Sequence, residues 1–237
     1  MVWQCRSEGS HWGSASVQLA LLLLLSQEDY NLMQRNSLSG KIPLSLTNLG
    51  NISKFELFRN KLFCESSTYF LTNWTKLTSL QIYGNTFSGI IPPEIGQLTK
   101  LEYLYLYQNN FSGSIPSDIG NLKVLFGLDL STYKLSGPIP PTIGNLHNLS
   151  VIALYQLTGT IPPEIGNLTS LTTLYLNINH LHGELPYTLS NLQKLMQCLI
   201  GEIPKIFADL ASLVHLKLFF DDNVLLRPQF SVFCLCL

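Results

Sequence analysis

Leucine and isoleucine recur along this chain in one arrangement that returns about every 24 residues. The clearest copy runs from residue 101 to residue 122 and reads LEYLYLYQNNFSGSIPSDIGNL. It opens with the spacing Leu-x-x-Leu-x-Leu, whose last two leucines are two residues apart and so lie on one face of a short strand. A single strand of this length cannot bury that face. The copies must therefore stack and share one continuous core.

The rest of each unit predicts a bend, a second extended edge and a helical turn. The side-chain amide of Asn109 can satisfy backbone groups at a buried bend, where unpaired polar groups are costly. Gly113 permits a tight backbone path after the bend. Ile115-Pro116 suits an extended edge where the missing proline N–H does no harm. Residues 119–122, Ile-Gly-Asn-Leu, predict a helical or 3₁₀ turn on the convex side.

Two sets of residues trace the repeat through the chain. The asparagines predict a ladder, interrupted by Tyr133 and by a deletion near Gln156, whose members are Asn60, Asn85, Asn109 and Asn179. The turn glycines are Gly89, Gly113, Gly137, Gly159, Gly183 and Gly201, at spacings of 24, 24, 22, 24 and 18 residues. The 18-residue interval lacks six residues and with them the turn after a strand. We therefore expect the weakest joint between Gly183 and Gly201.

The predicted fold is an α/β repeat solenoid with a parallel concave β-sheet and 3₁₀ or helical turns on the convex side. The array covers residues 28–225 in about nine units, two of them shortened. Residues 1–27 form an irregular leader whose apolar run, residues 17–25, has the length of a signal-peptide core but poor flanks, so a degenerate start to the array is the alternative. Residues 226–237 form an apolar tail. No apolar run reaches the roughly 18–20 residues that a membrane span needs.

The unit L-x-x-L-x-L-x-x-N-x-L-S-G-x-I-P-x-x-I-G-x-L resembles the plant-type leucine-rich repeat, as found in the ectodomains of plant leucine-rich repeat receptor-like kinases and receptor-like proteins. The resemblance covers roughly residues 28–225. It implies a curved right-handed horseshoe, a cell-surface or secreted location, and recognition of a peptide or protein ligand or of a co-receptor with leucine-rich repeats. Trp3 and Cys5 only faintly match the usual cysteine-containing cap, and no kinase domain follows. These departures indicate a truncated receptor, a short secreted relative or an imperfect gene model.

Composition and motifs exclude several function classes. Charged residues make up 12% of the chain and the net charge is −1, so nothing indicates nucleic acid or an anionic membrane as a partner. The five cysteines include no C-x-x-C, which argues against a disulfide framework or a zinc site. No phosphate-binding loop, nucleophile elbow or kinase motif occurs. We therefore expect no enzyme activity, no catalytic residue, no cofactor and no metal.

Three polar or sulfur-containing pairs receive plain interpretations. His180 and His182 are interpreted as a solvated turn, and Asp221-Asp222 as the polar end of a repeat. For Cys234 and Cys236 in the tail, pairing, palmitoylation and disorder all remain open.

The outward positions of the predicted strands can be aligned into columns across the units. The position after the second core leucine reads Glu56, Gln81, Tyr105, Asp129, Ala153, Tyr175 and Lys217. The position after the third reads Phe58, Tyr83, Tyr107, Ser131, Tyr155, Asn177 and Phe219. Five aromatic residues among seven exceed the 11% aromatic content of the chain, and exposed aromatics make effective contact surfaces. The predicted concave binding face consists of Phe58, Tyr83, Tyr105, Tyr107, Asp129, Tyr155 and Tyr175. The alternative is that tyrosine simply suits strand surfaces.

Five N-x-[ST] sequons predict N-glycosylation if the chain is secreted, at Asn51, Asn73, Asn110, Asn148 and Asn167. The leading hypothesis is a non-catalytic peptide- or protein-recognition module of a cell-surface receptor-like protein in signalling or defence. One alternative is a partial product of a leucine-rich repeat receptor serine/threonine kinase. Another is an intracellular repeat scaffold or a non-functional fragment, cytoplasmic if the leader does not function.

Overall fold

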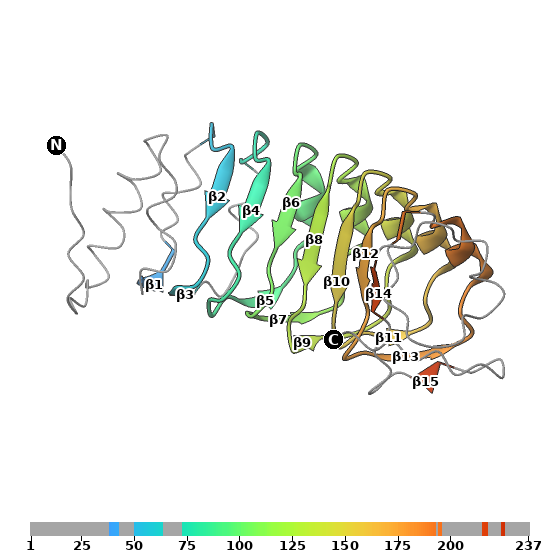
Figure 1. The fold of residues 1–237 in the computed structure, drawn as a ribbon. Coiled ribbons are helices and arrows are strands. Elements are labelled where there is room, and N and C mark those ends of the chain that lie inside the picture. Colours follow the sequence, from blue (N-terminus) through green and yellow to red (C-terminus); the bar gives the residue numbers. More distant parts are fainter. Residues whose placement is uncertain are drawn as a thin grey trace.

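The structure is a computed structural model that describes residues 38–42, 50–63, 73–192 and 194–195, together with the backbone of residues 215–217 and 224–225. Within these residues, short parallel strands lie side by side in two rows, and 3₁₀ helices lie along a third side (Figure 1). The expected leader, the apolar tail and, within the interval from Gly183 to Gly201, residues 193 and 196–201 lie outside the described residues, so their predicted boundaries stay predictions.

The first row is one parallel sheet in the order β14-β12-β10-β8-β6-β4-β2, and it lines the concave side. Its strands are β2 (Lys54–Glu56), β4 (Ser79–Gln81), β6 (Tyr103–Tyr105), β8 (Gly127–Leu130), β10 (Val151–Leu154), β12 (Thr173–Tyr175) and β14 (His215–Lys217). The second core position of each unit sits in this sheet, so that Leu80 pairs with Leu104 and Leu104 with Leu128. All three are buried, as the leucine spacing predicts.

The second row consists of short strands in three separate sheets, ordered β1-β3, β5-β7-β9 and β11-β13-β15. They are β1 (Ser39–Lys41), β3 (Lys61–Phe63), β5 (Ser88–Ile90), β7 (Asn110–Gly113), β9 (Lys134–Leu135), β11 (Thr158–Gly159), β13 (His180–Gly183) and β15 (Val224–Leu225). The convex side carries η3 (Pro93–Gln97), η4 (Ser117–Asn121), η5 (Pro141–Asn145), η6 (Pro163–Asn167) and η7 (Tyr187–Asn191). The predicted convex turn is therefore a five-residue 3₁₀ helix in each of these units.

The two shortened units behave differently in the concave sheet. Strand β10 of the 22-residue unit pairs with β8 on one side and β12 on the other, so the two missing residues do not interrupt the sheet. Strand β12, however, pairs directly with β14. The neighbour of β12 thus comes from the unit that begins at Leu213, and not from the unit that begins at Leu195. This agrees with the predicted column, which passes from Tyr175 straight to Lys217.

Four asparagines form the predicted ladder inside the bend, and all of them are buried. Asn85 shows the pattern: its Nδ2 donates to the Leu57 carbonyl of the preceding unit at 2.9 Å and to its own Ile82 carbonyl at 3.0 Å. Its Oδ1 accepts from the Leu62 N–H at 3.0 Å. One amide therefore satisfies backbone groups of two successive units, which is why the position selects asparagine.

The ladder is interrupted at Tyr133, as predicted, but the local structure adds something that the sequence did not indicate. Tyr133 is turned outward and is 68% exposed, while Thr132 immediately before it is fully buried. The Thr132 hydroxyl donates to the Phe111 carbonyl of the preceding unit at 3.4 Å. A shift of one residue thus replaces the missing amide with a shorter polar side chain.

The residue before the ladder position adopts a left-handed backbone in most units. Gly84 has φ +67° there, and Gln108 has φ +52°. Ile178 occupies the same position with φ +55°. A β-branched side chain is strongly disfavoured in this region because its Cβ substituents crowd the backbone. Ile178 therefore stores local strain that Gly84 avoids.

We expect Ile178→Gly to be more stable than Ile178→Ala by about 1 kcal/mol, the reverse of the usual order for these two residues. Both variants lose the half-buried isoleucine side chain, so the difference between them reports the cost of the positive φ. Urea unfolding of both proteins measures it. The same pair of substitutions at Thr173 in strand β12, where the backbone is extended, should give the ordinary order. Equal stability of the two variants at position 178 would show that the site carries no strain.

Candidate functional site

The concave face presents the two predicted columns in the predicted register. In the first column Glu56 lies opposite Gln81, Gln81 opposite Tyr105, and Tyr105 opposite Asp129. The column continues through Ala153 and Tyr175 to the backbone of Lys217. Strand stacking places neighbouring members about 4.8 Å apart. The sheet therefore arranges side chains from six units of the described residues on one continuous surface.

Three aromatic rings of the second column form an ordered stack. The ring centroids of Phe58 and Tyr83 are 4.5 Å apart with an interplanar angle of 8°. Those of Tyr83 and Tyr107 are 4.2 Å apart at 11°. The Tyr107 pKa is raised by burial and by a hydrogen bond to Tyr83, so this phenol stays neutral at physiological pH. Each ring is half-buried. The stack is thus a rigid aromatic ridge, which we call the Phe58–Tyr107 ridge.

The column is discontinuous beyond the ridge. Ser131 follows Tyr107, and the next aromatic member, Tyr155, lies one unit further on. The Tyr155 hydroxyl accepts a hydrogen bond from Asn177 Nδ2 at 3.3 Å, which ties this ring to the unit on its far side. The structure therefore groups Phe58, Tyr83 and Tyr107 together but places Tyr155 apart from them.

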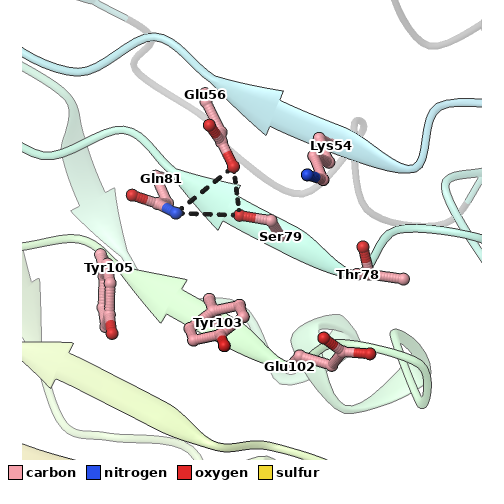
Figure 2. Close-up of a pocket in the computed structure, with 8 residues that line it drawn as sticks. All are labelled: Lys54, Glu56, Thr78, Ser79, Gln81, Glu102, Tyr103 and Tyr105. Carbon is pink, nitrogen blue, oxygen red and sulfur yellow. Dashed lines mark hydrogen bonds between the residues drawn. The ribbon is translucent and has the colours of Figure 1, made fainter. Parts of the chain in front are cut away.

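A hollow of about 300 Å³ opens on the concave face beside the ridge, across strands β2, β4 and β6 (Figure 2). Its lining consists of Lys54, Glu56, Thr78, Ser79, Gln81, Glu102, Tyr103 and Tyr105. On its floor, Ser79 Oγ donates to Glu56 Oε1 at 2.7 Å, and Gln81 Nε2 donates to Ser79 Oγ at 3.1 Å and to Glu56 Oε1 at 3.3 Å. Figure 2 shows these three side chains converging. We call this space the concave hollow.

The aromatic side of the concave hollow depends on a glycine in the next strand. Tyr103 and Tyr105 meet edge to face with ring centroids 6.1 Å apart. A Cβ on Gly127 would lie 3.0 Å from two carbons of the Tyr105 ring and closer still to its hydroxyl. Tyr105 therefore lies across the backbone of β8, and a side chain at position 127 would displace its ring from this place. Burial raises the Tyr105 pKa, and the nearby Tyr103 and Asp129 raise it further.

Asp129 is a mostly buried carboxylate in the first column, next to Tyr105. Its Oδ1 accepts the Ser131 backbone N–H at 3.0 Å. Burial raises the Asp129 pKa, and the hydrogen bonds from Ser131 only partly offset this. Among the described side chains, no lysine, arginine or histidine is paired with it. The first column thus carries a carboxyl group that has no cationic partner among the described side chains.

A second, shallower space of about 550 Å³ lies at the rim where the concave strands begin. Its lining consists of Glu102, Tyr103, Val124, Phe126, Asn148, Ser150, Ser170, Thr172 and Lys194. Phe126 is exposed, and its ring meets Tyr103 edge to face at 5.8 Å. Sequence reasoning missed this rim, and also Ser79 and Tyr103 in the concave hollow, because it followed only the positions after the second and third leucines. The position before the second leucine would have indicated Ser79 and Tyr103, and the position one residue earlier would have indicated the rim residues Glu102, Phe126, Ser150 and Thr172.

The five sequon asparagines all have exposed side chains. Asn110 begins strand β7, Asn167 ends η6, and Asn148 lies at the rim just described. Asn51 accepts a hydrogen bond from Lys76 Nζ at 2.8 Å. Attachment of a glycan at any of these positions therefore requires no unfolding.

The remaining candidate residues of the sequence analysis lie away from the concave face or outside the described residues. His180 and His182 are exposed on β13. Across the described part of the chain, no group of three or more histidine, cysteine, aspartate or glutamate side chains is arranged to hold a metal ion. None of the helices in that part is long and apolar enough to cross a membrane. Asp221-Asp222 and Cys234-Leu-Cys236 lie outside the described residues.

Comparison with known sequences supports the repeat assignment directly. The family model for the leucine-rich repeat region matches residues 88–175. A second model, Leucine Rich Repeat, matches residues 76–98 and 170–192. No curated protein matches the chain.

Three solved structures are similar to this chain at 32% sequence identity. One is the ectodomain of the Arabidopsis thaliana membrane receptor kinase GASSHO1/SCHENGEN3 in complex with CASPARIAN STRIP INTEGRITY FACTOR 2, with a TM-score of 0.70 over 80% of this chain and 23% of that one. Another is a TDR receptor, with a TM-score of 0.72 over 81% and 34%. The third is the Arabidopsis receptor kinase HAESA with the peptide hormone IDA and the co-receptor SERK1, with a TM-score of 0.65 over 84% and 34%. The chain spans about a quarter to a third of the length of these ectodomains.

The stacked parallel strands, the 3₁₀ turns and these matches define the molecule as a leucine-rich repeat solenoid. More particularly, its repeats are of the plant type and are similar to those of these receptor ectodomains, as its S-G-x-I-P units predict.

Proposed function

We propose that the concave face binds a peptide or an extended protein segment, and that the chain is the non-catalytic recognition module of a cell-surface receptor-like protein in signalling or defence. The observation that carries this proposal is the Phe58–Tyr107 ridge beside the concave hollow. Ordered aromatic rings offer contact area at little entropic cost, and the hollow adds directional polar groups. Tyr105, Asp129, Tyr155 and Tyr175 extend the same surface.

The related structures give this proposal its ligand class. GASSHO1/SCHENGEN3 is described in complex with CASPARIAN STRIP INTEGRITY FACTOR 2, and HAESA with a peptide hormone and a co-receptor. By analogy, the ligand of this chain is a peptide, and a co-receptor with leucine-rich repeats is a second partner. A parallel sheet with outward side chains at strand spacing suits an extended chain laid across it.

The cell-surface setting rests on the sequons as well as on this analogy. All five asparagines are exposed, and none of them belongs to the two concave columns. We therefore propose glycosylation at Asn51, Asn73, Asn110, Asn148 and Asn167. Glycans at these positions leave the concave columns uncovered.

The test is a selection of random peptides displayed on phage against the full chain secreted from plant cells. A mobility shift after glycosidase treatment first verifies that the protein passed through the secretory pathway. We expect the wild-type protein to select peptides, and Tyr83→Ala/Tyr107→Ala to bind the same peptides more than tenfold more weakly. The reason is that the double variant removes two rings of the ridge and the stacking between them.

The matched control removes two tyrosines that lie away from the concave face. Tyr133 is 68% exposed before strand β9, and Tyr187 is 75% exposed in η7. Tyr133→Ala/Tyr187→Ala should bind the selected peptides like the wild type, and thermal melts should show that both double variants are folded. Undiminished binding by Tyr83→Ala/Tyr107→Ala would exclude the concave face as the site.

A further inference from the structure

The aromatic column is broken at a single unit, and the break has a defined width. Ser131 stands where an aromatic ring would continue the stack, between Tyr107 on one side and Tyr155 on the other. Tyr155 is held toward Asn177, away from the break. Two strand spacings, about 9.6 Å, therefore separate the backbones that carry the two rings. Ser131 leaves one face of Tyr107 without the aromatic neighbour that Tyr83 provides on the other face.

The carboxylate of Asp129 lies in the same unit as this break, two residues before Ser131. On β10, the residue opposite Asp129 is Ala153, which is small and buried. Tyr105 lies opposite Asp129 on β6. The unit that lacks a ring in the second column thus carries an unpaired carboxylate in the first column, with only a small side chain on its far side.

A buried carboxylate without a cation costs stability, because burial disfavours its charged form. The fold does not need the charge, since an asparagine at this position would also accept the Ser131 N–H. A buried carboxylate of this kind is typical of a binding site in which the ligand supplies the cationic partner. The partner must carry a positive charge to pair with Asp129 and must be flat to stack on Tyr107. Of the natural side chains, only the arginine guanidinium is both permanently charged and planar.

We propose that the concave face recognises an arginine side chain of its ligand, which pairs with Asp129 and stacks on Tyr107 above Ser131. This inference rests on the proposed function and specifies its ligand: a peptide with an arginine at the position that meets β8, the central strand of the seven-stranded sheet. Ser131 acts by being small, and Asp129 supplies the charge that distinguishes arginine from a neutral side chain.

The experiment uses the same phage selection, now read by sequencing the bound peptides. With the wild-type chain we expect arginine to be enriched at least threefold over the input library at one peptide position. Asp129→Asn should return arginine to its input frequency while peptides are still selected. Ser131→Tyr should do the same, because the new ring would occupy the face of Tyr107. Replacing the arginine of a selected peptide by lysine should weaken binding to the wild type by about tenfold, because lysine cannot stack as a plane.

A matched control changes a carboxylate that lies on the convex side. Asp118 in η4 accepts a hydrogen bond from Ser117 Oγ at 3.3 Å, and Asp118→Asn should keep the arginine preference. Thermal melts at pH 7 should show all three variants folded.

The outcomes separate this inference from the proposed function. Peptides selected without arginine enrichment, or with enrichment that survives Asp129→Asn, would overturn the inference while the binding face stands. Equal enrichment of lysine and arginine would overturn the claim that the site requires a planar cation. If the concave face selects no peptide at all, the proposed function fails together with the inference.

Discussion

Asn109→Leu is expected to lower the free energy of unfolding by about 3 kcal/mol, although it replaces one side chain with another of similar size. Asn109 Nδ2 donates to the Ile82 carbonyl of the preceding unit and to its own Leu106 carbonyl, both at 2.9 Å. Its Oδ1 accepts the Phe87 N–H at 3.1 Å. The Ile82 carbonyl keeps a bond from Asn85, but the other two groups would be buried without a partner. Chemical unfolding monitored by circular dichroism measures the loss.

The control for this variant is an exposed asparagine on the convex side. Asn145 ends η5, and Asn145→Leu should change the free energy of unfolding by less than about 0.5 kcal/mol. The unit at Tyr133 shows how the prediction about Asn109 can fail. There a one-residue shift places Thr132 in the buried position. A loss below about 1 kcal/mol for Asn109→Leu would mean that the chain shifts by one residue and places Gln108 in the buried position, as Thr132 is placed in its own unit.

The repeat period alone predicts most of the fold, because it specifies which residues of neighbouring units contact each other as well as the contacts within each unit. Leu104 predicts Leu80 and Leu128 as neighbours once the 24-residue offset is known, and the register confirms both pairs. The concave columns follow from the same offset. The left-handed turn before the ladder did not follow, because Gln108 and Ile178 are not residues that favour positive φ. Their backbone is imposed by the turn between the two rows of strands.

The directions of the side chains on the concave face could not be predicted from the sequence for a different reason. The columns list which residues point outward, but side-chain direction depends on neighbours in other columns. Tyr105 lies across β8 because Gly127 offers no side chain there. Glu56 faces Ser79 because the two occupy neighbouring strands and one can donate to the other. Such pairings decide where the concave hollow lies, and no single column contains them.

These details favour a face that is rigid before any ligand binds. The Phe58–Tyr107 ridge is stacked ring on ring, and the floor of the concave hollow is joined by hydrogen bonds between neighbouring units. A preorganised face loses little entropy on binding. Such a face requires close packing between units. If one unit were displaced, its side chains would lose their stacking and hydrogen-bond partners in the neighbouring unit. The 3₁₀ helices of neighbouring units meet on the convex side, and we expect their packing to set that spacing.

Gly144→Ala is expected to lower the free energy of unfolding by about 3 kcal/mol through this convex packing. Gly144 lies in η5 and faces the backbone of η6. A Cβ at this position would lie 2.6 Å from Glu164 Cβ, 2.9 Å from its carbonyl carbon and nearer still to its carbonyl oxygen. Two of these three atoms belong to the backbone, so a side-chain rotation cannot relieve the contact. Gly96, Gly120 and Gly166 meet the next unit in the same way, which explains why the convex turn repeats Ile-Gly.

The variant should also weaken binding by the concave face, because η5 and η6 would have to move apart. Urea unfolding measures the stability, and the selected peptides measure the binding. Gly50→Ala is the matched control, since among the described residues the nearest atom to a Cβ there is the Asn73 carbonyl oxygen at 4.0 Å. It should leave both quantities unchanged within error. If Gly144→Ala lost stability but kept full affinity, the spacing of the concave columns would be set by the sheet alone. If it lost neither, the convex helices would have room to separate, and the repeated glycine would need another explanation.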